Sequence, residues 1–95
     1  MKVELSAEAQ AQVDRIDAWW RENRQAAADL FAEEMEQALR TLAETPAVAV
    51  RYGPKPSVRR LLLRRTHHHL YVIEESARVY VVAVWSAYRG RGPRL

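Results

Sequence analysis

Cysteine is absent from the sequence, and glycine, proline and phenylalanine are scarce, with three, four and one residue in a chain of 95. The absence of cysteine excludes a disulfide scaffold, a thiol nucleophile, a thiolate zinc site and an iron–sulfur cluster. No apolar run approaches the roughly 20 residues that a membrane-spanning helix needs. The first residues also lack the apolar segment of a signal peptide. We therefore expect a cytoplasmic protein with no membrane partner.

Charge is divided unevenly along the chain. Residues 1–45 hold five basic and ten acidic side chains, a net charge of −5, whereas residues 46–95 hold ten basic and two acidic side chains, a net charge of +8. Nine of the ten basic residues in the second half are arginine, whose planar guanidinium suits contacts with carboxylate or phosphate groups. This asymmetry predicts an acidic partner for the second half.

The length and the composition, with 48% hydrophobic and 28% charged residues, indicate a single globular domain over residues 1–95. Within it, residues 89–95 alternate arginine with glycine and proline. Nothing in that pattern predicts a helix or a strand, so we expect a flexible basic tail.

The first half of the chain predicts a short strand followed by two helices. Residues 2–5 alternate as a strand does, and Ser6 is a candidate N-cap for a helix that ends near Asn23. A second helix is expected over residues 25–44. Core packing is expected for both Trp19 and Trp20. The two helices carry apolar stripes at helical spacing, made of Ala9, Val13, Ile16 and Trp20 in the first and Ala28, Phe31, Met35, Ala38 and Leu42 in the second.

The second half predicts a loop and three strands. Three prolines and one glycine favour a loop over residues 45–57. Residues 58–65, 68–74 and 79–85 are rich in strand-forming residues, and their short connections favour an antiparallel meander. The predicted fold class is α+β, in the order β-α-α-β-β-β, with an antiparallel sheet packed on an αα-hairpin.

Both faces of that sheet are predicted to be apolar. Residues 61–63 and 79–85 have apolar side chains at successive positions, whereas a strand with one wet face would alternate. The helical hairpin can cover only one face. The loop, the tail or another molecule must therefore cover the other.

Three consecutive histidines, His67, His68 and His69, form the most conspicuous local motif. On a strand only His67 and His69 would share a face, and two histidines without cysteine fall short of the three or four ligands of a transition-metal site. We therefore expect no metal site and no cofactor.

Several segments resemble the RelE/ParE superfamily of toxins from bacterial type II toxin–antitoxin modules. They are Ile-Asp-Ala-Trp-Trp at 16–20, Leu-Ala-Glu-Thr-Pro at 42–46, Val-Arg-Arg-Leu-Leu-Leu at 58–63, His-His-Leu-Tyr-Val-Ile-Glu-Glu at 68–75, and Val-Tyr-Val-Val-Ala-Val-Trp-Ser-Ala-Tyr-Arg-Gly-Arg at 79–91. The resemblance implies a growth-inhibiting toxin that a cognate antitoxin neutralises in a hetero-oligomer. A ParE-like member would bind DNA gyrase and would not be an enzyme. The alternatives are a RelE-like endonuclease that cuts mRNA on the ribosome, and a nontoxic interaction module on the same fold.

The resemblance also proposes site residues. A RelE-type site uses basic residues on the sheet, an arginine near the end of the last strand and a C-terminal tyrosine; the matching positions here hold His68, Ala87 and, close to the tyrosine, Pro93. These departures favour the ParE-like interpretation. RNA cleavage would need a base, an acid and cations around the phosphate, and the candidates for that alternative are Arg60, Arg64, His68, Tyr88 and Arg89.

Contacts with macromolecules are assigned to the basic residues of the second half. The expected target-binding residues are Arg89, Arg91 and Arg94 in the tail. The expected antitoxin-binding residues are Arg59, Arg60, Arg64, Arg65 and Trp85.

Overall fold

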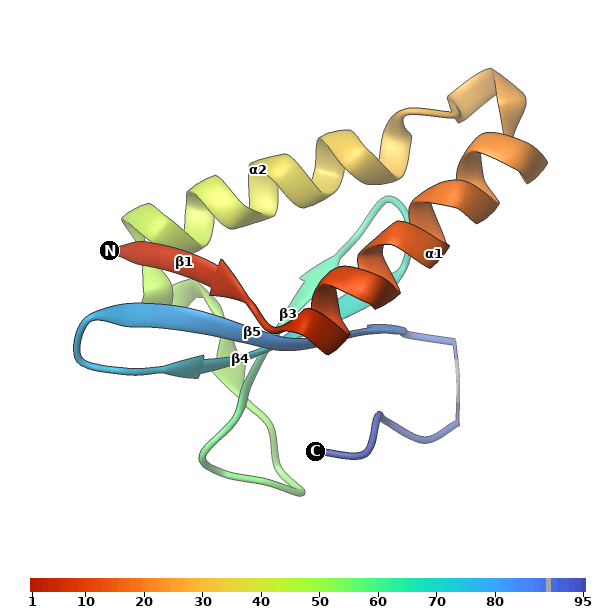
Figure 1. Ribbon diagram of the computed structural model, residues 1–95. Helices are drawn as coiled ribbons and strands as arrows, with labels where there is room; N and C mark the ends of the chain where they lie inside the picture. Colours follow the sequence, from red (N-terminus) through yellow and green to blue (C-terminus); the bar gives the residue numbers. More distant parts are fainter. Residues whose placement is uncertain (89) are drawn as a thin grey trace.

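The computed structural model describes residues 1–88 and 90–95. Within these residues, two α-helices lie on one face of a five-stranded sheet with the strand order β1-β5-β4-β3-β2 (Figure 1). The elements in chain order are β1 (Lys2–Leu5), α1 (Ala7–Asn23), the 3₁₀ turn η1 (Gln25–Ala27), α2 (Leu30–Glu44), the 3₁₀ turn η2 (Pro46–Val48), β2 (Val50–Arg51), β3 (Arg59–Leu63), β4 (His68–Glu74) and β5 (Arg78–Ser86). The predicted α+β class is confirmed. None of the described helices is long and apolar enough to cross a membrane.

The sheet combines the predicted meander with two short edge strands. Strands β3, β4 and β5 pair antiparallel in sequence order, as expected. Strand β1 pairs parallel with β5, with Val3 opposite Val79, so the sheet is mixed rather than wholly antiparallel. Strand β2 lies inside the segment predicted as a loop and pairs only with Arg59 and Arg60. Beyond Arg60, the outer edge of β3 has no strand partner within the described part of the chain.

Helix α1 begins as the sequence predicts. The side-chain oxygen of Ser6 accepts a hydrogen bond from the backbone N–H of Ala9 at 3.0 Å, which caps the helix. Trp20 packs against the core, as expected. Trp19 lies about 100° further around the helix and is 48% exposed, so the expectation of core packing is wrong for this residue. The sheet and α2 cover only one side of α1.

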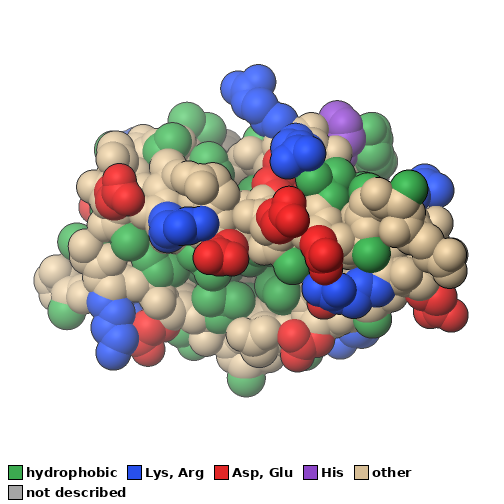
Figure 2. Space-filling model, turned by 90° about the horizontal axis from the view of Figure 1, so that it is seen from above, with side chains coloured by type: hydrophobic (Ala, Val, Ile, Leu, Met, Phe, Trp, Pro, Cys, Tyr) green, Lys and Arg blue, Asp and Glu red, His purple; other side chains and the backbone are tan. Residues whose placement is uncertain are grey.

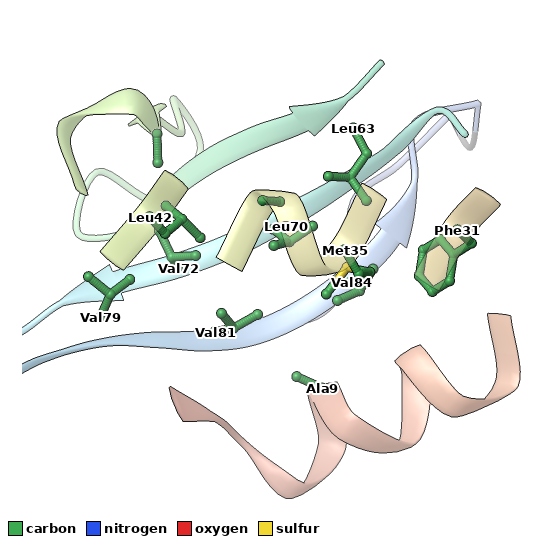
Figure 3. Packing of buried hydrophobic residues seen from close by; sticks show 12 residues of the cluster. Ala9, Phe31, Met35, Leu42, Leu63, Leu70, Val72, Val79, Val81 and Val84 are labelled. Carbon is green, nitrogen blue, oxygen red and sulfur yellow. The ribbon is translucent and has the colours of Figure 1, made fainter. Parts of the chain in front are cut away.

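Helix α2 starts later than predicted. Residues 25–29 form η1 and a turn, and the helix runs from Leu30. The guanidinium of Arg21 contacts the Asp29 carboxylate at 2.7 Å, which ties this turn back to α1. The predicted stripe of α2 is buried against the sheet except for Ala28, which precedes the helix and is half-buried (Figure 3). The buried members are Phe31, Met35, Ala38 and Leu42.

A bulge in β5 interrupts the alternation of its side chains between the two faces of the sheet. Tyr71 pairs with Ala83, but the next residue, Val72, pairs with Val81, so one residue of β5 has no partner in β4. As a result Val82 and Ala83 both contribute to the far face, while Val81 and Val84 reach the helix-covered core. The bulge therefore shifts the alternation between faces midway along the strand.

The far face of the sheet is covered by the chain itself. Val58 and Tyr71 are buried there, with Tyr52 and Leu95 packed against them. The ammonium of Lys55 donates to the Leu95 carbonyl at 2.9 Å. Figure 1 shows this loop and the C-terminal segment on the side of the sheet opposite the helices. The sequence analysis expected the loop, the tail or another molecule to cover this face, and the structure shows the loop and the C-terminal segment there.

Candidate functional site

The far face of the sheet contains a hollow of about 290 Å³ between β3, β4, β5, the loop after β2 and the C-terminal segment. Its floor follows from the strand register. Arg60 of β3 lies opposite Tyr71 of β4, and His69 of β4 lies opposite Trp85 of β5. Cross-strand partners share a face, so these four side chains project together on the side away from the helices.

Aromatic packing holds the cationic group at this hollow. The guanidinium of Arg60 lies 5.2 Å from the ring centroid of Tyr52. The Tyr52 ring meets Tyr71 edge-on at 5.1 Å, and Tyr71 is only 2% exposed. Arg60 is thus positioned by the Tyr52 ring, which Tyr71 supports edge-on, rather than by a carboxylate.

The electrostatics of the hollow favour an anion. Arg60 and Arg91 line the hollow, and no Asp or Glu is among the described residues that line it. Burial lowers the pKa of His69 from its ordinary value of 6.5, and the positive charge of Arg60 lowers it further. The imidazole is therefore neutral near pH 7, and the arginines carry the charge. Such a surface can bind a phosphate or carboxylate group of a partner.

The C-terminal segment closes one side of the hollow. The indole N–H of Trp85 donates to the carbonyl of Arg91 at 3.0 Å. Gly92 passes directly over Tyr52, because a Cβ atom at this position would lie 2.5 Å from the tyrosine hydroxyl. Only glycine allows the segment to approach this closely.

The structure separates the residues proposed for RNA cleavage. Arg60 lies in the far-face hollow. His68 lies on the opposite face, where its ring packs on Phe31 at 5.3 Å. Burial lowers the pKa of His68, and the backbone of Thr66 and the charge of Glu34 act in the opposite direction. The candidate base His68 and the candidate cation Arg60 therefore lie on opposite faces of the sheet.

Of the other members, Tyr88 lines a hollow of about 420 Å³ together with His68, whereas Arg64 lies on a different surface. Arg64 lines a groove of about 620 Å³ between α2 and β3. Tyr88 is 76% exposed and stacks on His67, with ring centroids 4.8 Å apart. Arg89 lies outside the described residues. The structure thus does not bring Arg60, Arg64, His68 and Tyr88 together.

The predicted antitoxin-binding residues divide between two surfaces. Arg60 and Trp85 lie at the far-face hollow, and Arg64 and Arg65 line the groove between α2 and β3. Arg59 points to the helix-covered side, where it donates to the carbonyl of Ala49 at 3.4 Å.

Two of the three predicted target-binding residues are described. Arg91 borders the far-face hollow, whereas Arg94 lines a separate hollow beside Lys55 and Leu95. Arg89 again falls outside the described residues.

Sequence reasoning missed Tyr52, His69 and Tyr71 as members of this site. Tyr52 belongs to a proline-containing loop whose path could not be predicted. The alternation of His69 and Tyr71 along β4 was a usable signal, because side chains two positions apart share a face. Among the described residues, no three side chains of His, Asp or Glu gather where they could hold a metal ion; the expectation of no metal site stays a prediction.

The fold and the hollow together define a small α+β protein with a helical hairpin on one face of its sheet and a basic, aromatic surface on the other. The chain belongs to the ParE toxin family: the model of the ParE toxin of the type II toxin–antitoxin system parDE matches residues 3–89. No curated protein matches it in sequence. The superfamily resemblance seen in the sequence is confirmed.

One solved structure similar to this chain is described as the chromosomal ParDE TA system from P. aeruginosa. The superposition has a TM-score of 0.75 with 18% sequence identity, and it covers 90% of this chain and 95% of that chain. At this identity the similarity shows a shared fold.

Proposed function

We propose that this protein is a cytoplasmic toxin that inhibits growth by binding DNA gyrase, and that a cognate antitoxin neutralises it in a complex. The observation that carries the proposal is the family match, which extends over residues 3–89. The toxin–antitoxin system named for the structural relative supports an antitoxin partner.

The placement of the candidate nuclease residues supports gyrase binding over mRNA cleavage. General acid–base catalysis needs groups within hydrogen-bonding reach of the same substrate, about 2.6–3.2 Å between heavy atoms. Arg60 and His68 lie on opposite faces of the sheet, and Tyr88 packs against the β3–β4 turn. His68 and Tyr88 line one hollow, but neither Arg60 nor Arg64 lines it, so the four described groups share no substrate position.

The groove between α2 and β3 is the surface we assign to the antitoxin. Its sheet side is Leu61–Leu63, whose outer edge lacks a strand partner among the described residues. Such an edge accepts an added strand, and the groove accepts apolar side chains. The guanidinium groups of Arg64 and Arg65 make no ion pair within the described residues, so they are available to antitoxin carboxylates.

The target contact is assigned to the tail arginines Arg89, Arg91 and Arg94. The side chains of Arg91 and Arg94 are exposed, and exposed charges contribute little to folding, typically below about 1 kcal/mol. Replacing Arg91 and Arg94 with alanine should therefore keep the melting temperature and weaken growth inhibition. Full growth inhibition by the folded double variant would contradict this assignment.

The target is tested by inducing the chain in its host and by adding the purified protein to gyrase. We expect growth arrest with a DNA-damage response in cells, and loss of supercoiling activity in the purified reaction. Ribosome-dependent cleavage of mRNA with unaffected gyrase would instead establish the endonuclease alternative. No growth effect would favour the nontoxic interaction module.

The antitoxin assignment needs a separate measurement with a matched control. Arg64→Glu with Arg65→Glu should weaken binding of the product of the neighbouring gene, because like charges would face its carboxylates. Lys2→Glu reverses an exposed charge in β1, at the opposite edge of the sheet, and should leave binding unchanged. Equal binding by both variants would contradict the assignment.

A further inference from the structure

Two exposed aromatic side chains from distant parts of the sequence meet at one hollow. Trp19 in α1 is 48% exposed and Tyr88 after β5 is 76% exposed, and both line a hollow of about 420 Å³. All other aromatic residues of the chain are buried or half-buried. A tryptophan can bury about 150–250 Å². Trp19 forgoes about half of that burial, and exposed apolar groups that gather in one place are typical of an interaction surface.

The backbone at this hollow is held in a conformation that costs energy. His67 has φ 60°, and it is the one non-glycine residue in the left-handed region within residues 1–88 and 90–95. Its N–H donates to the Leu63 carbonyl and its carbonyl accepts from Ala87, both at 2.8 Å. This geometry places the imidazole 4.8 Å from the Tyr88 ring. Such strain persists where the surrounding structure enforces it, often at functional sites.

The charge around the two rings has one sign. The guanidinium of Arg24 lies 5.4 Å from the Trp19 ring centroid, and Arg65 lines the same hollow. Trp19 also lines an adjoining hollow of about 260 Å³, which Arg15 borders. No Asp or Glu is among the described residues lining either hollow. None of these three arginines makes an ion pair within the described chain.

This charge differs from that of the neighbouring helix surface. Figure 2, which views the molecule from the side of the helices, shows acidic side chains over the helices with Lys and Arg between and around them. Arg21 and Arg40 make ion pairs with carboxylates on their own helix or turn. The arginines at the aromatic hollow have no such partners, so a partner's carboxylates can reach them without displacing an existing pair.

The exposed side chains around this hollow form what we call the Trp19 surface, made of Trp19, Tyr88, His67, Arg24 and Arg65. We propose that the Trp19 surface binds a protein segment that inserts an apolar side chain between the rings and places carboxylates at the arginines. Tryptophan, tyrosine and arginine dominate the residues that carry binding energy in protein interfaces. Charge complementarity then selects an acidic segment over a basic one. The inference goes beyond the proposed function and does not depend on gyrase being the target.

A protein segment fits this surface better than a nucleic acid. Sequence-tolerant binding of single strands depends on bases stacking against open aromatic faces. Here Arg24 lies over Trp19, and His67 stacks on Tyr88 at an interplanar angle of 39°. What remains open is the hollow that both rings line, to which Ile16 and Trp20 add apolar surface. A concave apolar site of this kind accepts an aliphatic or aromatic side chain.

The test measures binding of defined peptides to the purified chain by fluorescence anisotropy. The probe is a labelled peptide of about 12 residues with two phenylalanines flanked by glutamates. Its counterpart has lysine at each glutamate, and a single-stranded oligonucleotide of about 12 nucleotides represents the other class of ligand. We expect the glutamate peptide to bind most tightly, and more weakly when NaCl rises from about 50 to about 300 mM.

The variants assign binding to the Trp19 surface. Trp19→Ala and Tyr88→Ala should each weaken the glutamate peptide about tenfold or more. Tyr80→Ala is the matched control, because Tyr80 packs under Arg78 at the other end of β5 and is absent from both hollows. It should leave binding within about twofold. The double variant Arg24→Glu, Arg65→Glu alters exposed side chains only. It should shift the binding preference to the lysine peptide. This variant keeps the test decisive if an aromatic variant fails to fold.

Three results would overturn the proposal. The first is a glutamate peptide that does not bind, or that binds the wild type and Trp19→Ala equally. The second is tighter, Trp19-dependent binding of the oligonucleotide. The third is a dimer of the free protein that Trp19→Ala dissociates, because the occupant would then be a second copy of this chain.

Discussion

The carboxylate of Glu34 in α2 and Thr66 in the β3–β4 turn are joined by two hydrogen bonds. One carboxylate oxygen accepts the backbone N–H of Thr66 at 3.0 Å and its hydroxyl at 2.7 Å. The other oxygen accepts the backbone N–H of Arg65 at 2.7 Å. Thr66 is only 5% exposed, so these donors depend on Glu34. This contact fixes the turn that positions Arg64, Arg65 and His67.

Removing this anchor should destabilise the protein measurably. Glu34→Ala leaves the buried donors of Thr66 without an acceptor, and the expected loss is about 2 kcal/mol of unfolding free energy, or roughly 10 °C in melting temperature. Glu33→Ala, at an exposed neighbouring position, should cost less than about 0.5 kcal/mol. Thermal melts followed by circular dichroism measure both. Equal melting of the two variants would show that the anchor contributes nothing.

A second buried polar contact connects α1 to β5. The side-chain oxygen of Gln12, which is 7% exposed, accepts the backbone N–H of Val84 at 2.7 Å. Strand β1 pairs with β5 only as far as Val81, so Gln12 supplies the acceptor where that strand has ended. Gln12→Ala should therefore cost about 2 kcal/mol in chemical denaturation. Gln10→Ala, on the exposed side of the same helix, is the control, because it makes the same change of residue type without removing a buried acceptor. A similar loss in both variants would contradict the role given to the Gln12 contact.

Position 92 is predicted to require glycine, whereas position 90 should accept alanine. A Cβ at Gly92 would lie 2.5 Å from the Tyr52 hydroxyl, whereas nothing lies within 4 Å of one at Gly90. Gly92→Ala must displace Tyr52 or lift the segment, with an expected cost of about 1 kcal/mol. Trypsin should then cleave faster after Arg91 and Arg94. Unchanged cleavage relative to Gly90→Ala would contradict the close packing seen here.

Stability should fall as the pH drops below neutrality. Burial lowers the pKa values of His68 and His69 from 6.5 in the folded protein, so the unfolded chain binds more protons than the folded one around that pH. Stability is therefore fully present above about pH 7.5 and declines as the pH falls through 6.5 toward the folded pKa values. Most carboxylates stay ionised down to about pH 5.5, which makes the window from pH 7.5 to 5.5 informative.

The double variant His68→Gln, His69→Gln isolates this effect. Its melting temperature should change less between about pH 7.5 and pH 5.5 than that of the wild type, because the depressed imidazoles no longer titrate. Differential scanning calorimetry at several pH values measures the slope. A wild-type stability that is constant or rises as the pH falls through this window would contradict the burial of these side chains.

The sequence by itself determined β1, the two helices, the three strands of the meander and most of the helix-covered core. Ser6 predicted the start of α1, because its hydroxyl can satisfy a free backbone donor there. The helical spacing of Phe31, Met35 and Leu42 predicted the buried side of α2, since residues three and four apart share a face. The span of β4 matched the prediction from residue 68 to residue 74. These features follow from interactions that are local in the chain.

Only the tertiary structure decided how the functional surfaces are assembled. The bulge at Val82, the parallel pairing of β1 with β5 and the exposure of Trp19 depend on segments that are distant in sequence. The adjacent His68 and His69 became separated by the sheet, whereas Trp19 and Tyr88, from opposite ends of the chain, came to share one hollow. Local periodicity tells which residues lie on one face of an element. It does not tell which elements, loops and chain ends meet at that face, because packing across the whole domain decides that.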